Sequence, residues 1–324
     1  MLRKTLLLTL LIVLLTACAP QATATVAPVP TTVPATEAPT VAPTAMPTGI
    51  TLTDGLGREV KLTAPAQRIV SLAPSNTEIL FAIGAGSQMV GRDQLSDYPD
   101  AAKAVTDIGS TFDKLNTELI ISLKPDLVLA AEINTADQVK ELESLGLTVY
   151  YLKNPTTLEE LYTNINIVAQ LTGHESDSAK LVDGLKARVA TVDAKIATVT
   201  EKPSVFYELD ATDPAKPYTA GKGAFITTLI ERAGGTNIAG DVDGYPQFSL
   251  EQVVAANPNF IILGDAAYGI TTESVAARPG WSGLDAVKNN QVVPFDDNLA
   301  SRPGPRLVDG LEALAKLLHP DLFK

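Results

Sequence analysis

The sequence predicts an α/β protein with two lobes joined by one long helix. Its 324 residues, 45% of them hydrophobic, exceed one ordinary hydrophobic core. Short apolar runs typical of buried strands alternate with helical patterns, and this alternation favours parallel sheets wrapped by helices. One apolar stripe over residues 182–196 predicts a helix over about residues 175–199, and a helix of about 37 Å can connect two lobes.

Residues 1–17 have the pattern of a secretory signal. Arg3 and Lys4 precede an apolar run over residues 6–15, which is too short to cross about 30 Å of hydrocarbon as a helix. Residues 15–18 read Leu-Thr-Ala-Cys, which resembles the bacterial lipobox. We therefore expect Cys18 to be lipidated and to become the first residue of the mature protein, held at the outer face of the cell membrane or in a periplasm. The alternative is an ordinary signal peptide with an unmodified Cys18.

Residues 18–48 are expected to form a linker carrying the lipid anchor. The segment is rich in Pro, Thr and Ala, with seven prolines and Glu37 as its single charge. Prolines at this frequency forbid helix and sheet, and nothing large is available to bury. The linker would tether a globular domain to the membrane.

The composition narrows the function classes. With 37 acidic and 25 basic residues, the chain has no positive field to attract nucleic acid. One cysteine and two histidines leave little for a metal site, and we predict no metal and no cofactor. No Gly-rich phosphate loop, Gly-x-Ser-x-Gly elbow or histidine dyad occurs, so we do not expect an enzyme.

The N-terminal lobe is assigned to residues 49–174. It begins with an expected hairpin, in which Ile50–Thr53 and Glu59–Leu62 flank a turn-rich insert. The polar segment 74–78 then leads into an apolar helix over 79–83, closed by glycine. Three further apolar runs predict buried strands over residues 68–72, 127–130 and 149–152.

The interlobe helix is assigned to residues 175–200 and the C-terminal lobe to residues 201–324. Apolar side chains at alternating spacings of three and four form one helical stripe over 182–196. Strand patterns then return at residues 205–209, 260–263 and 292–295. Trp281, in a Pro-Gly-rich loop, is expected to anchor the C-terminal lobe.

The two predicted lobes share a sequence phrase. Residues 116–130 align without a gap with residues 249–263, and each segment has a capping-type residue, a glutamate two positions later, an apolar helical turn, a proline and a strand. Glu118 and Glu251 thus occupy equivalent first turns of two short helices. Each acid could simply complement its helix dipole. Alternatively, the pair could dock a partner that also has two similar halves.

Several of these segments carry a family resemblance. Residues 68–78, 96–99, 115–118, 123–128 and 218–222 together resemble the cobalamin and iron-siderophore solute-binding proteins of ABC importers, in the right order over residues 50–322. The resemblance implies two α/β lobes joined by one rigid helix, with a ligand cleft between the lobes. It also implies a monomeric extracytoplasmic receptor that delivers its ligand to a permease and its ATPase.

The resemblance also assigns ligand-binding residues one by one. Two tryptophans of the vitamin B12-binding relatives fall on Phe112 and Tyr245, and a further aromatic position falls on Tyr218. An arginine of a late Arg-x-x-Pro-Arg loop falls on Arg302, while Arg306 could contact the ligand or brace the loop. The two acidic positions that pair with permease arginines fall on Glu118 and Glu251.

Two ligand classes remain open. A cleft lined by aromatics with few charges suits the broad face of a corrinoid, whereas a ferric siderophore or haem would use Arg302 and the tyrosines. Both family tryptophans are smaller aromatics here, and a family tyrosine is replaced by Leu95. A surface adhesin or sensor with the same fold is the alternative to transport.

Overall fold

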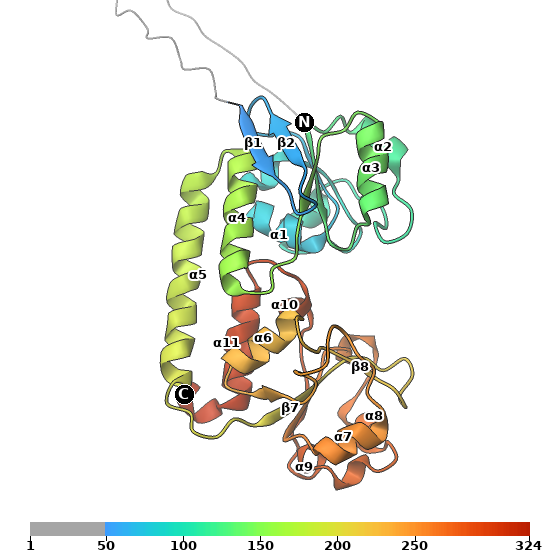
Figure 1. Ribbon diagram of the computed structural model, residues 1–324, viewed down its shortest axis with the longest axis vertical. Coiled ribbons are helices and arrows are strands. Elements are labelled where there is room, and N and C mark those ends of the chain that lie inside the picture. The colour runs from blue at the N-terminus through green and yellow to red at the C-terminus, as the bar shows by residue number, and fades with distance from the viewer. Residues whose placement is uncertain (1–48) are drawn as a thin grey trace, which may run out of the picture. The chain divides into compact units, whose positions relative to one another are not determined.

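The computed structural model describes residues 49–324 (Figure 1). The expected signal segment, Cys18 and the linker lie outside the described residues. Among the described residues, no helix combines the length and the apolar character that a membrane span requires.

The N-terminal lobe contains a four-stranded parallel sheet in the order β4-β3-β5-β6, beside the antiparallel hairpin β1-β2 (Figure 1). Most strand residues are buried, as expected for a parallel sheet covered on both faces. Its elements are β1 (Ile50–Thr53), β2 (Glu59–Leu62), β3 (Ile69–Ser71), α1 (Pro74–Ala82), β4 (Met89–Arg92), α2 (Thr117–Ser122), β5 (Leu127–Ala131), α3 (Ala136–Ser144), β6 (Val149–Leu152) and α4 (Leu158–Thr172).

Two details of this lobe differ from the sequence expectation. Helix α1 begins at Pro74, not at residue 79, because proline is tolerated in the first turn of a helix. Strand β4 was not predicted, since Gly91 interrupts its apolar pattern. A Cβ at Gly91 would lie 2.8 Å from Leu123 Cδ1, so close packing of the strand requires glycine there.

The long helix α5 (Glu175–Ile196) joins the lobes and ends four residues before the end of the predicted interlobe helix, 175–200. It packs against α4 of the N-terminal lobe and against α11 (Leu307–Leu318) of the C-terminal lobe (Figure 1). Arg188 on α5 also bonds Glu312 on α11, with an Nε–Oε1 distance of 2.8 Å. One hydrophobic cluster runs from β3 and α1 through α4 and α5 to α6 and α11, so the lobes share a core along this side.

The C-terminal lobe has a five-stranded sheet in which β11-β10-β7-β8 are neighbours and β9 also pairs with β7. All pairs are parallel except β7 with β8. Trp281 is fully buried in the core of this lobe, as predicted. The elements are β7 (Ser204–Asp210), β8 (Tyr218–Thr219), α6 (Phe225–Arg232), β9 (Thr236–Asn237), α7 (Leu250–Ala256), β10 (Phe260–Leu263), α8 (Thr272–Ala276), α9 (Asp285–Lys288), β11 (Val292–Pro294) and α10 (Asn298–Ser301).

The two sheets repeat one topology. The order β4-β3-β5-β6 in the first lobe corresponds to β9-β7-β10-β11 in the second. Helices α2 and α7, which carry the shared sequence phrase, both end at a left-handed residue before proline: Lys124 with φ 49° and Asn257 with φ 42°. The residue after each proline makes an equivalent hydrogen bond. Asp126 accepts one from the backbone N–H of Arg68 at 3.0 Å, and Asn259 accepts one from the backbone N–H of Ser204 at 2.8 Å. The sequence repeat is therefore a repeat of structure.

Candidate ligand cleft and docking surface

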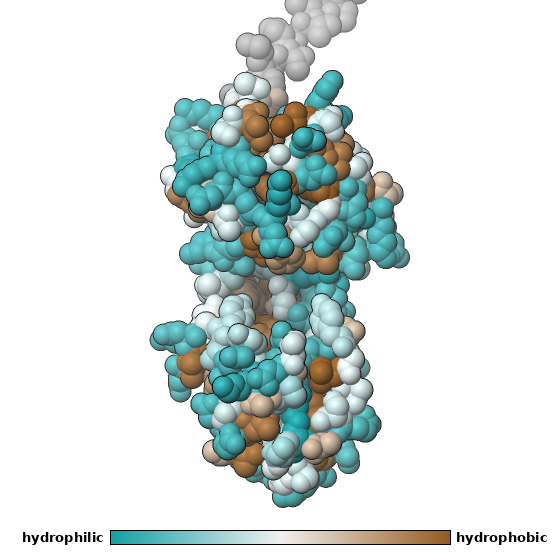
Figure 2. Space-filling view, turned by 90° about the vertical axis from the view of Figure 1, so that its right-hand side faces the viewer, coloured by the Kyte–Doolittle hydropathy of each residue, from teal (hydrophilic) through white to brown (hydrophobic). Residues whose placement is uncertain are grey.

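Two adjoining cavities lie between the lobes. The first, of about 300 Å³, and the second, of about 230 Å³, share Asn154, Ser301 and Pro303. Their walls come mainly from the loops that follow β3, β4, β5 and β6 in one lobe and β9, β10 and β11 in the other, and ligand sites of parallel sheets lie at these carboxyl ends. Figure 2 shows the molecule narrowed at mid-height, between its two bulkier parts. The expected cleft between the lobes is confirmed.

The first cavity combines aromatic and aliphatic side chains from both lobes. Phe112 and Leu95 line it from the N-terminal lobe, with 52% and 42% of their surfaces exposed. Tyr268 lines it from the opposite lobe and is 88% exposed. Tyr268 was not predicted as a site residue, although it lies in the loop after the predicted strand 260–263, where ligand contacts are expected.

Tyr245 lines the second cavity and is 60% exposed. Partial removal from water and the negative charges of Glu132 and Asp297 raise the pKa of its hydroxyl. Tyr218 is 43% exposed and pairs with Gln247 beside strand β8, but it lines neither cavity. The structure thus brings Phe112 and Tyr245 to the cleft and leaves Tyr218 outside both cavities.

A third cavity, of about 470 Å³, adjoins Tyr268 and covers the carboxyl ends of β7 and β10. Asp265 lines it and is almost fully buried. Burial, together with the nearby charge of Glu208, raises the pKa of Asp265 to about 6. The C-terminal wall is therefore acidic beyond Tyr268.

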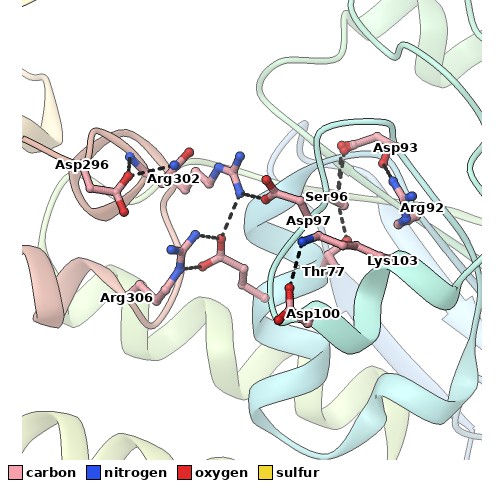
Figure 3. Close-up of polar contacts among 12 residues, drawn as sticks. Thr77, Arg92, Asp93, Ser96, Asp97, Asp100, Lys103, Asp296, Arg302 and Arg306 are labelled. Atoms are coloured by element: carbon pink, nitrogen blue, oxygen red, sulfur yellow. Dashed lines mark hydrogen bonds and ion pairs between the residues drawn. The ribbon is translucent and has the colours of Figure 1, made fainter. Parts of the chain in front are cut away.

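Arg302 lines the first cavity, but its charge is already paired (Figure 3). Its Nη1 donates to Asp97 Oδ1 at 2.7 Å and lies 3.6 Å from Glu78 Oε1. Although partial burial opposes it, the Arg302 guanidinium holds the pKa of Asp97 below its usual value. Arg302 therefore faces the first cavity as part of an ion-pair group.

Arg306 stabilises the loop between α10 and α11 and links the two lobes. It makes two hydrogen bonds to the carboxylate of Glu78, one of them 2.9 Å long from Nε, across the lobes (Figure 3). Its guanidinium also lies 4.1 Å from the ring centre of Tyr98. Glu78 is 3% exposed, so this bridge is shielded from water. The sequence left the role of Arg306 open, and bracing is the role that the structure shows.

Asp297 lines the first cavity. Its Oδ1 accepts hydrogen bonds from Tyr207 Oη and Ser301 Oγ, both at 2.8 Å. Burial raises its pKa despite these two hydrogen bonds. Within residues 49–324, no three His, Cys, Asp or Glu side chains converge as metal ligands.

Glu118 and Glu251 are exposed in the first turns of α2 and α7. Neither forms an ion pair with another residue of the described part of the chain. The caps of these helices are made by other residues. Asn116 accepts from the backbone N–H of Leu119, and Ser249 forms a reciprocal capping box with Gln252.

Comparisons with known proteins agree on one family. Residues 69–299 match the family model described as periplasmic binding protein. The chain is 36% identical over 280 residues to an ABC transporter substrate-binding lipoprotein of Bacillus subtilis, covering 85% of this chain and 87% of the relative.

Two solved structures share the fold over most of their length. The periplasmic vitamin B12-binding protein of Vibrio cholerae matches with a TM-score of 0.68 and 30% identity, covering 80% of this chain and 99% of that one. A periplasmic heme-binding protein of a Roseiflexus species matches with a TM-score of 0.71 and 28% identity, covering 79% and 99%.

Proposed function

The chain belongs to the periplasmic binding protein family, and from this premise we propose that it is a lipid-anchored receptor that delivers a corrinoid to an ABC permease and its ATPase. Members of this family are substrate-binding components of transporters, not enzymes. The binding site that we propose is the cleft between the lobes, with Phe112, Tyr245 and Arg302 as ligand contacts. Tyr218 would contact only a ligand that extends beyond the two interlobe cavities.

The charge of the cleft is the observation that carries the choice of a corrinoid. Lys153 and Arg302 are the basic side chains lining the three cavities, and Arg302 is paired with Asp97. The acids in the same walls are Glu132, Asp210, Asp265 and Asp297. An anionic siderophore needs converging cations and would meet an acidic wall instead. Exposed aromatics and scattered polar groups suit a broad apolar face with amide edges.

Haem or a ferric siderophore is the second candidate. Tyr268 and Tyr245 offer phenol oxygens in the cleft, and tyrosine is a known haem ligand. The resemblance to a heme-binding protein also supports this alternative.

Glu118 and Glu251 are the proposed contacts with the permease, and Cys18 is the proposed lipid anchor. The two glutamates are exposed, equivalent in the two lobes and without an ion-pair partner among residues 49–324, which suits a permease with two similar halves. The lipobox-like segment 15–18 and the lipoprotein relative support the anchor.

Uptake of radiolabelled cobalamin tests the receptor role. Cells lacking this protein should lose uptake at low cobalamin concentration, and the wild-type protein should restore it. The variant Glu118→Ala/Glu251→Ala should restore less than a tenth, while its affinity for cobalamin stays within about threefold, because the carboxylates act on association with the partner. The control Asp137→Ala/Glu273→Ala removes first-turn acids of α3 and α8, one in each lobe, and should restore uptake fully. Equal uptake with and without the protein would contradict the proposal.

A further inference from the structure

An exposed apolar side chain follows each proposed docking glutamate by one helical turn. Ile121 on α2 is 41% exposed, and Val254 on α7 is 39% exposed. Residues three apart lie on the same face of a helix, so each helix presents a carboxylate next to a β-branched side chain. Ile121 and Val254 also occupy equivalent positions of the repeat, three residues after Glu118 and Glu251.

These two side chains lie outside the hydrophobic cores of their lobes. The preceding residues, Ile120 and Val253, are fully buried and anchor their helices. By contrast, Ile121 and Val254 do not belong to the hydrophobic clusters of the described residues. A single exposed apolar residue needs no explanation. Two of them at matched positions, each beside a carboxylate that forms no ion pair within residues 49–324, form a repeated surface pattern that the hydrophobic cores do not require.

The spacing between the two helices is fixed by the surrounding structure. Each helix is followed by a left-handed residue, a proline and a buried strand. The lobes are held to each other by α5 and by the Arg306–Glu78 bridge. A partner that fits one patch therefore meets the other at a set distance, and the second contact becomes intramolecular.

We infer that Glu118 with Ile121, and Glu251 with Val254, form two equivalent acidic–apolar docking patches that receive the same element of the permease twice. This inference rests on the proposed function, and it specifies the partner surface. Each half of the permease presents a cation flanked by an apolar side chain. The carboxylates attract that cation and speed association, whereas the apolar contacts slow dissociation.

The test is binding of the full-length protein to the permease–ATPase complex of its own cell, reconstituted in nanodiscs and measured by biolayer interferometry. Ile121→Ser/Val254→Ser should raise the dissociation rate about tenfold or more, because the variant no longer buries two β-branched side chains against the permease. Its association rate and salt dependence should stay within about twofold of wild type. Glu118→Ala/Glu251→Ala should instead slow association and flatten its dependence on salt.

Leu145→Ser/Val242→Ser is the matched control, because these side chains are each 44% exposed, one in each lobe, and lie outside α2 and α7. It should bind as wild type does, and thermal melts should show all variants folded. If the Ile121 and Val254 variant dissociates at the wild-type rate while the glutamate variant is impaired, the apolar inference is wrong and the proposed function stands. If the wild-type protein does not bind the permease, the proposed function fails and the inference fails with it.

Discussion

Replacing Arg306 with methionine should destabilise the protein by about 3 kcal/mol. The substitution leaves Glu78 buried, at 3% exposure, without its two hydrogen bonds from Arg306. Removing one partner of a buried ion pair typically costs about 3–5 kcal/mol. We expect the lower end because Arg302 Nη1 still lies 3.6 Å from the Glu78 carboxylate.

Urea unfolding followed by circular dichroism measures this loss. Arg188→Met is the matched control, because Arg188 also pairs with two acids across α5 and α11, but its side chain and those of both partners are at least 40% exposed. Exposed pairs contribute about 0–1 kcal/mol, so the control should lose no more than that. Glu78→Gln/Arg306→Met should lose less than Arg306→Met alone, since the unpaired buried charge is gone. A loss from Arg306→Met no larger than that of the control would refute the reasoning.

Three further predictions concern the anchor, the cleft and a buried acid. Cys18→Ala should abolish incorporation of labelled lipid and shift the protein to the aqueous phase in detergent partitioning; a wild-type protein without lipid would contradict the anchor. Tyr245→Ala should weaken cobinamide binding more than tenfold in calorimetry, since burying an aromatic against ligand contributes about 1.5–3 kcal/mol, whereas Tyr162→Phe, on α4 and lining neither interlobe cavity, should bind normally. Burial raises the pKa of Asp93 to about 6 from 3.8 in spite of hydrogen bonds from Ser96, so its stabilising contribution is present below pH 4 and is lost as pH rises through 6. Asp93→Asn should therefore gain stability relative to wild type by up to about 3 kcal/mol between pH 4 and pH 8, and a constant difference in urea unfolding across that range would contradict the assignment.

Local sequence patterns predicted most of the sheet framework. The hairpin has the predicted bounds because a turn-rich insert separates its two strands. Strands β6 and β10 coincide with their predicted ranges because each is a short apolar run between turn signals. The strands that were missed, β4, β8 and β9, are interrupted by glycine or only two residues long. Their pairing is decided by neighbouring strands, which a local pattern does not contain.

The cleft was harder to predict than the fold. The resemblance placed Phe112, Tyr245 and Arg302 at the interlobe cavities, but the partners of Arg302 and Arg306 were not predicted. Glu78 is separated from Arg306 by 228 residues, and its place in the polar segment before the predicted helix gave no sign of a charge partner. Such contacts follow only from the docking of the two lobes.

Calorimetry of the mature protein with cobalamin, cobinamide, haem and a ferric siderophore tests the central claim most directly. An acidic, aromatic cleft with its arginine already paired should bind cobalamin or cobinamide at least tenfold more tightly than haem or the siderophore. Tight binding of a ferric siderophore or haem, with no heat from either corrinoid, would contradict the account.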